Sequence, residues 1–154
     1  KSKIVEVWGL DPSDALSEMA KKVALNKSLE INFISSGAEE IPLPDNHFDT
    51  VLITYTMCTI PEVLRANDEI RRVLKSEGKM IFCEHGVAPD ENIRKWQNRI
   101  NPYWGMLAGG CNINRDIPSL IEDSGFDIIE LEEMYLPKTP KIAGYNYWGY
   151  AVAK

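Results

Sequence analysis

The stretch FDTVLITYTMCTIPEVLRANDEIRRVLKSEGKMIFCEH, residues 48–85, decides the fold of this chain. It opens with a β-branched run at 50–55, which is typical of a strand buried in a parallel sheet. Pro61 suits the first turn of a helix, and Gly78 suits the position just past a helix end. A second apolar run, KMIFCEH at 79–85, predicts another strand. Strand, helix and strand in this order predict an α/β fold built on parallel strands.

The segments on either side continue the alternation. Ser13 is a good N-cap for a helix whose apolar face carries Leu16, Met19 and Val23 at helical spacing. The chain closes with two strand patterns in succession, so we expect a mostly parallel sheet with an antiparallel strand at the C-terminus. The further expected ranges are strands at 3–10, 29–35, 126–135 and 145–153, and helices at 91–106 and 116–124.

The composition limits the partners. A chain of 154 residues suits one domain with a single core, which we expect to span 1–154. The net charge is −6 and no segment is rich in Lys and Arg, which argues against a nucleic-acid partner and against an anionic membrane surface. No apolar run is long enough to span a bilayer, and no signal peptide is visible.

Three cysteines, Cys58, Cys83 and Cys111, stand far apart in the sequence. They have neither the spacing of a zinc site nor that of a disulfide framework, so we expect no metal and a reducing, cytoplasmic setting. The favoured interpretation of each is a small, buried apolar side chain.

Several of these segments together resemble a known family. The stretches GLDPSDALSEMAKKVA at 9–24, GAEEIPLPDNHFDTVLITYTM at 37–57 and IRRVLKSEGKMIF at 70–82 resemble the small-molecule branch of the class I S-adenosylmethionine-dependent methyltransferases. The likeness runs from about Val7 to the C-terminus. The segment at 94–117 resembles a narrower subgroup, which is itself similar to the animal thiol methyltransferases.

The resemblance implies a Rossmann-like three-layer sandwich with the strand order 3-2-1-4-5-7-6. Strand 3–10 then corresponds to the second strand of the family, so the first strand, its glycine-rich loop and its helix are missing from this chain. The missing strand is central, and its place lies between 3–10 and 50–55. In a competing alignment, 3–10 is the first strand and Glu6 its acidic residue. Large side chains such as Trp8 argue against that alignment, because the glycine motif needs close backbone approach.

In the family pattern the acid that ends the second strand binds the ribose of the cofactor, S-adenosyl-L-methionine. Here that residue is Asp11, with Pro12 beside it. A carboxylate suits the task because its two oxygens can accept one hydroxyl each. The alternative is that Asp11 caps the following helix together with Ser13.

The other cofactor residues implied by the resemblance follow the third and fourth family strands. Ala38 and Glu39 would lie beside the adenine, and Gly37 stands where the family often has an acid or a serine. Thr54 and Tyr55 would pass the methionine part, with Tyr55 as a wall beside the methyl group.

The predicted catalytic and substrate residues lie further along the chain. His85 ends a strand at the expected crevice and is a candidate general base, or else a structural histidine. Trp96, Asn112 and Arg115 are candidates for substrate contacts. The alternatives are that Trp96 belongs to the helix core and that Arg115 pairs within the protein.

These observations favour an S-adenosylmethionine-dependent methyltransferase that acts on a small molecule, with a thiol or hydroxyl acceptor. The alternative is a non-catalytic remnant of the fold that acts as an interaction module, and a homodimer is then expected through unpaired strand edges. A weaker third hypothesis is a nicotinamide-dependent oxidoreductase, because an acid at a strand end also suits that ribose.

Overall fold

A computed structural model of the chain describes residues 6–154, so residues 3–5 of the predicted first strand lie outside it. The elements alternate as the sequence predicts, and the strands of the 48–85 unit flank one helix. The elements are β1 (Trp8–Leu10), α1 (Asp14–Asn26), β2 (Asn32–Ile34), β3 (Phe48–Thr54), α2 (Val63–Val73), β4 (Leu74–His85), α3 (Glu91–Leu107), α4 (Ile117–Asp123), β5 (Phe126–Tyr135) and β6 (Tyr145–Ala153).

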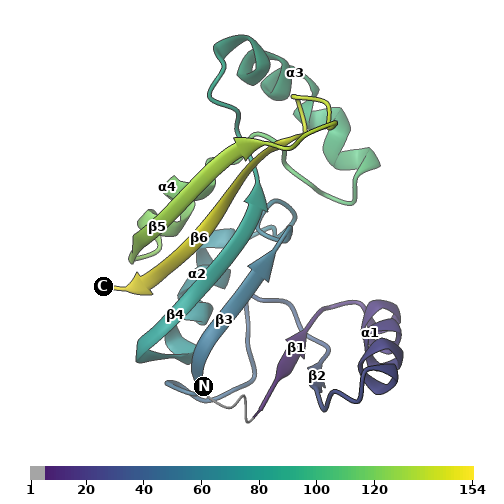
Figure 1. The fold of residues 1–154 in the computed structure, drawn as a ribbon, viewed down its shortest axis with the longest axis vertical. Coiled ribbons are helices and arrows are strands. Elements are labelled where there is room, and N and C mark those ends of the chain that lie inside the picture. The colour runs from purple at the N-terminus through teal and green to yellow at the C-terminus, as the bar shows by residue number, and fades with distance from the viewer. Residues whose placement is uncertain (1–5) are drawn as a thin grey trace.

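The strands form two separate sheets (Figure 1). One sheet has four strands in the order β3-β4-β6-β5, where β3 and β4 are parallel and β6 is antiparallel to both of its neighbours. Only β6 therefore runs in the opposite direction, which confirms the antiparallel C-terminal strand. The order matches the 4-5-7-6 half of the family pattern.

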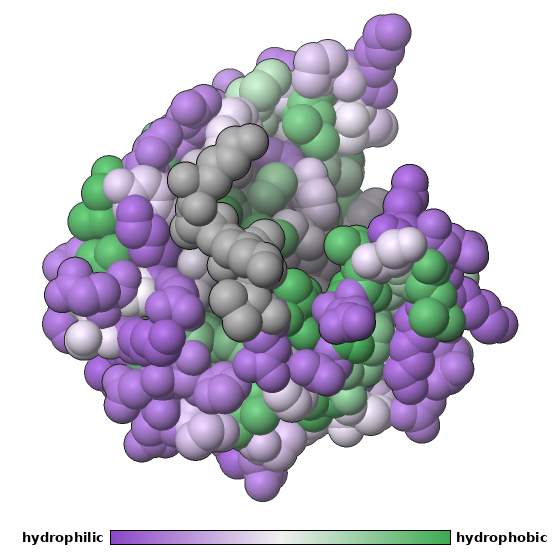
Figure 2. Space-filling model, turned by 60° about the horizontal axis from the view of Figure 1, so that its bottom comes forward, coloured by the Kyte–Doolittle hydropathy of each residue, from purple (hydrophilic) through white to green (hydrophobic). Residues whose placement is uncertain are grey.

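The second sheet consists of β1 and β2 alone, which pair in parallel. Within residues 6–154, no ladder of hydrogen bonds joins β1 to β3. This break is where the resemblance placed a missing central strand, so the sheet is interrupted there. Trp8 and His47 lie edge to face across the junction, with ring centroids 6.3 Å apart. Figure 2, in which the bottom of Figure 1 is turned forward, shows a hollow in this surface with hydrophobic residues around it.

The main core lies between the four-stranded sheet and the helices α2 and α4, which cover one of its faces (Figure 1). Ile53, Ile70, Phe82 and Ile121 are among its buried side chains. The opposite face carries apolar side chains in water, since Leu52 is 67% exposed. A groove of about 500 Å³ crosses this face; among its lining residues are Ile81, Trp148 and Tyr150.

The predicted cap of α1 is confirmed, and the apolar face that follows it is exposed. Ser13 caps the helix by accepting a hydrogen bond from Leu16 N at 3.3 Å. Met19 is 62% exposed, and Leu16 and Val23 are exposed as well. Periodicity identifies an apolar face but not a partner, and these three side chains face solvent in the described structure.

The end of α2 also differs from the prediction. The helix stops at Val73, and Leu74 already has extended backbone angles because it pairs with Phe48 of β3. The register shifts between this pair and the next one, and Gly78 lies in the bulge of β4 rather than at a helix end. A Cβ atom on Gly78 would meet Lys75 O at 2.8 Å, so this tight turn requires glycine. No helix in the described part of the chain is long and apolar enough to cross a membrane.

Candidate functional site

The candidate site lies where β1, β3 and β4 end. Parallel strands present their carboxyl ends at one edge of an open α/β sheet, and ligands bind outside that edge. Asp11 directly follows β1, Tyr55 directly follows β3, and His85 is the last residue of β4. The predicted residues at these three positions therefore all belong to strand ends.

Asp11 is half-buried and takes part in the turn that starts α1. Its Oδ1 accepts a hydrogen bond from Ser13 N at 2.7 Å, and its backbone N–H donates to Ile34 O at 3.2 Å. The capping alternative is thus observed. Oδ2 makes no hydrogen bond to the residues that the structure describes, which leaves an acceptor at the strand end. Pro12 is exposed beside it. The ribose role of both residues stays a prediction.

Residues 37–40 form a tight turn after β2. Glu40 N donates to Gly37 O at 3.3 Å, and the Glu39 side chain folds back over the turn. A Cβ atom on Gly37 would lie 2.7 Å from Glu39 Oε2, so the absence of a side chain makes room for this carboxylate. Ala38 is half-buried. The turn offers backbone groups and one carboxylate near the end of β2, and the adenine role of Gly37, Ala38 and Glu39 stays a prediction.

Tyr55 has a left-handed backbone, with φ of +51°. This conformation costs a bulky residue on the order of 1–3 kcal/mol and is concentrated at functional sites. The strain is held by two bonds, from Tyr55 N to Cys83 O at 3.0 Å and from Tyr55 Oη to Asn146 Oδ1 at 2.7 Å. Burial raises the pKa of the phenol. Thr54, the last residue of β3, is exposed. The sequence carries no signal for the strain.

Glu84 is a buried carboxyl group that sequence reasoning passed over. It is fully buried, and its Oε1 accepts a hydrogen bond from Thr56 N at 2.8 Å. Its Oε2 is buried and has no hydrogen-bond partner within residues 6–154. Burial raises the pKa of Glu84, which favours its neutral form. The position next to His85 was visible in the sequence, but the burial was not.

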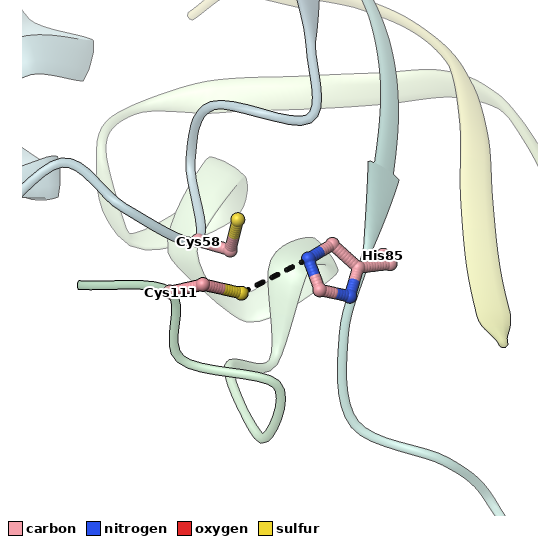
Figure 3. Close-up of side chains that lie close together, drawn as sticks. All are labelled: Cys58, His85 and Cys111. Carbon is pink, nitrogen blue, oxygen red and sulfur yellow. Dashed lines mark hydrogen bonds between the residues drawn. The ribbon is translucent and has the colours of Figure 1, made fainter. Parts of the chain in front are cut away.

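Cys58, His85 and Cys111 come together beside the end of β4 (Figure 3). Cys111 Sγ lies 3.3 Å from His85 Nε2, and the ligand atoms of the three residues lie within 4.8 Å of one another. Both thiols are buried, and burial raises the pKa of Cys58 to about 12. Burial also lowers the pKa of His85, so its imidazole is neutral at neutral pH. Cys58 and Cys111 are buried, as expected, but they are not isolated, and Cys83 is only half-buried.

Asn112 and Arg115 hold this cluster in place. Asn112 reaches Cys58 O twice, from its backbone N at 2.8 Å and from Nδ2 at 3.1 Å. Arg115 Nη1 donates to the carbonyls of Met57 and Ile60. Burial lowers the pKa of Arg115. Its hydrogen-bond partners are neutral carbonyl groups. These contacts agree with the alternative of pairing within the protein, and the substrate role of both residues stays a prediction.

Trp96 does not belong to the helix core, so that alternative is wrong: its side chain is 56% exposed. The buried residue of α3 is the neighbouring Gln97. Gln97 accepts from Ala88 N at 2.9 Å and donates to the carbonyls of Gly86, Ile113 and Ile142. The amide thus fixes α3 against the loops around it. The predicted contact of Trp96 with a substrate stays a prediction.

The comparison with protein families decides the classification. A family model described as a methyltransferase domain matches residues 1–82, more than half of the chain. The chain belongs to this family of methyltransferase domains. The resemblance predicted from the 9–24, 37–57 and 70–82 segments is confirmed.

Similarity to individual methyltransferases extends beyond the matched half. The chain is 26% identical over 147 residues to the human thiol S-methyltransferase TMT1A, covering 93% of this chain and 60% of that protein. It is 27% identical over 152 residues to the ubiquinone/menaquinone biosynthesis C-methyltransferase UbiE of Brucella canis, covering 81% and 56%. The chain therefore spans about three fifths of the length of the curated relatives it matches.

Solved methyltransferase structures share the fold. A SAM-dependent methyltransferase from Methanosarcina mazei superposes with a TM-score of 0.74 at 16% identity, covering 96% of this chain and 82% of that one. The Rossmann-like α/β architecture expected from the sequence is thereby confirmed.

Proposed function

We propose that this chain is part of an S-adenosyl-L-methionine-dependent methyltransferase whose acceptor is a small molecule, with a thiol favoured over a hydroxyl. The observation that carries the proposal is the break in the sheet, flanked by Asp11 at the end of β1 and by Tyr55 at the end of β3. In open α/β folds ligands bind outside the carboxyl ends of the strands, and these two residues follow such ends.

The residues present fit the cofactor. Asp11 has an acceptor oxygen without a partner among the described residues, and a ribose presents two hydroxyl donors. The turn at Gly37–Glu39 supplies backbone groups for a base, and Thr54 is an exposed hydroxyl at the end of β3. When bound, the cofactor supplies an electrophilic methyl group on a sulfonium sulfur. The chain contributes binding, alignment and the exclusion of water.

The preferred acceptor follows from the relatives and from the chemistry of the site. The human and rat relatives are thiol S-methyltransferases, whereas the UbiE relatives are C-methyltransferases. A neutral acceptor thiol must lose its proton to become a good nucleophile. His85 is neutral because burial lowers its pKa, so it can accept that proton at neutral pH. Tyr55 lies beside it, with ring centroids 6.0 Å apart.

The test is isothermal titration calorimetry with S-adenosylhomocysteine. It is run on the 154-residue chain and on the chain together with any residues that its reading frame encodes upstream of Lys1. The second protein is expected to bind, and Asp11→Asn should weaken binding at least about tenfold because a charge-assisted hydrogen bond is lost. Asp127→Asn, at the start of β5, is the matched control and should bind like the wild type. Absence of binding to the longer protein would contradict the proposal.

We further propose that the 154-residue chain associates with itself in the reducing cytoplasm, where its three free cysteines are stable. The open edges of β1 and β3 and the apolar face that carries Leu52 and Ile81 favour a second copy as the partner. This would also be the basis of a non-catalytic interaction module. Sedimentation equilibrium should find a dimer that Leu52→Lys weakens, with the exposed Leu64→Lys on α2 as control. A monomer at all concentrations would contradict self-association.

A further inference from the structure

We propose that Cys58, His85 and Cys111 form a zinc site with an exchangeable fourth position. Among the divalent cations of the cell, zinc is the one that suits a ligand set of two thiols and an imidazole. The three residues come from the loop after β3, from the end of β4 and from the loop after α3 (Figure 3). Their convergence therefore results from the tertiary fold rather than from a local motif.

The distances suit a tetrahedral metal. With Zn–S near 2.3 Å and Zn–N near 2.0–2.1 Å, tetrahedral zinc separates a sulfur from a nitrogen ligand by about 3.6 Å and two sulfurs by about 3.8 Å. Cys111 Sγ and His85 Nε2 are 3.3 Å apart, and every ligand pair in the cluster lies within 4.8 Å. Ligand atoms at most 4.8 Å apart need to approach one another by only about 1 Å to reach the tetrahedral separations.

The surroundings keep the two thiol loops together. The bonds from Asn112 to Cys58 O join the Cys58 loop to the residue that follows Cys111. Asn101 supports this link, because its Nδ2 donates to Asn112 Oδ1 at 3.0 Å and its Oδ1 accepts from Ile113 N at 3.0 Å. Outer hydrogen bonds of this kind orient metal ligands.

Three protein ligands indicate a catalytic zinc site rather than a structural one. Structural zinc sites are closed by four protein ligands, whereas catalytic sites use three and leave one position for water or substrate. Among the residues described, only these three offer ligand atoms to the cluster. The fourth position would take a small thiol: its S–H bond breaks, the sulfur electron pair binds zinc and the proton passes to the buffer. This last step rests on the proposed function, and it makes His85 a ligand instead of a proton acceptor.

The first experiment measures metal binding without any enzymatic assay. The 154-residue chain, kept reduced with a phosphine, is loaded with zinc, dialysed and analysed for metal, and cobalt titration then reports thiolate-to-metal charge transfer. We expect about one zinc per chain, with loss of binding in Cys58→Ser and Cys111→Ser. Cys83→Ser is the matched control, because Cys83 lies on β4 outside the cluster, and it should bind normally. Asn112→Ala should weaken zinc binding by about 10–100-fold.

Further outcomes separate the proposal from its rivals. If a serine variant does not fold, mass spectrometry of the alkylated wild type decides instead: zinc should protect Cys58 and Cys111 but leave Cys83 reactive. Three results would overturn the zinc site. They are a wild-type chain that retains no zinc, a loss of zinc binding in Cys83→Ser equal to that in the other serine variants, and a Cys58–Cys111 disulfide that forms in place of metal binding. Adding 2-mercaptoethanol to the cobalt form should raise the charge-transfer intensity about 1.5-fold, from two thiolates to three. No rise would overturn the thiol position, while S-adenosylhomocysteine calorimetry on the protein with the residues encoded upstream of Lys1 tests the proposed function separately.

Discussion

The N-terminal unit, residues 6–35, and the C-terminal unit, residues 48–154, are built differently. In the C-terminal unit, apolar side chains of β3, β4 and β6 are enclosed by α2 and α4, and the buried amide of Gln97 has hydrogen-bond partners for both its oxygen and its nitrogen. In the N-terminal unit, the apolar face of α1 faces water and β1 pairs only with β2. One unit has its own core, whereas the other has surfaces that need a partner. The break in the sheet lies between them, at the edge where both units contribute predicted cofactor residues.

The largest expected effect contrasts the two units directly. Phe82→Ala removes a fully buried ring from the core of the C-terminal unit and should lower the free energy of unfolding by about 3–5 kcal/mol. Met19→Ala, on the exposed face of α1, should change it by less than about 0.5 kcal/mol. Urea denaturation followed by tryptophan fluorescence measures both. Equal losses would mean that α1 packs against something as firmly as the core does.

A smaller effect tests whether the buried hydrogen bonds of Gln97 stabilise the C-terminal unit. Gln97→Leu removes an amide that bonds one N–H and three carbonyls, so their buried groups lose partners. We expect a loss of about 3 kcal/mol, set by the cost of unsatisfied buried groups. The neighbouring Asn98 is exposed, and Asn98→Leu is the matched control. Similar unfolding curves for the two variants would contradict the anchoring role of Gln97.

The third prediction concerns the segment that joins the units. Arg72 of α2 donates to Ile41 O at 2.7 Å and Leu43 O at 2.8 Å, and Glu69 Oε2 accepts from Ile41 N at 2.8 Å. The hydrogen bond from Arg72 lowers the pKa of Glu69 to about 2. A lowered folded-state pKa stabilises the protein above the ordinary carboxyl pKa, and this contribution disappears as the pH falls from about 4.5 towards 2.

Glu69→Gln should therefore cost about 2 kcal/mol of unfolding free energy at pH 7, and the gap to the wild type should narrow as the pH falls through that window. Urea denaturation at pH 7, 4 and 3 measures it. Glu62→Gln, which removes one partner of an exposed pair with Arg65, should show neither the loss nor the pH dependence. A gap that is constant with pH would rule out the ionised Glu69 carboxylate as the cause.

The sequence predicts the order of elements well, because strand and helix patterns at 48–85 are strong and local. It does not predict the exposure of α1, since periodicity shows which side of a helix is apolar but not whether a partner covers it. The end of α2 at Val73 depends on the pairing of Leu74 with Phe48, which is a long-range contact. The cluster of Cys58, His85 and Cys111 was invisible for the same reason: 26 and 27 residues separate its members. Strand ends were the available signal, and they had identified His85 alone.

The most direct test of the central claim is an amide NMR titration with S-adenosylhomocysteine on the protein translated with any residues its reading frame encodes upstream of Lys1. If the cofactor lies at the break between the units, the amides of Asp11 and Tyr55, one in each unit, shift together with those of Gly37 and Glu39 in the segment between the units, and those of β5 do not. No shifts, or shifts confined to one unit or to the groove on the exposed face of the sheet, would contradict the account.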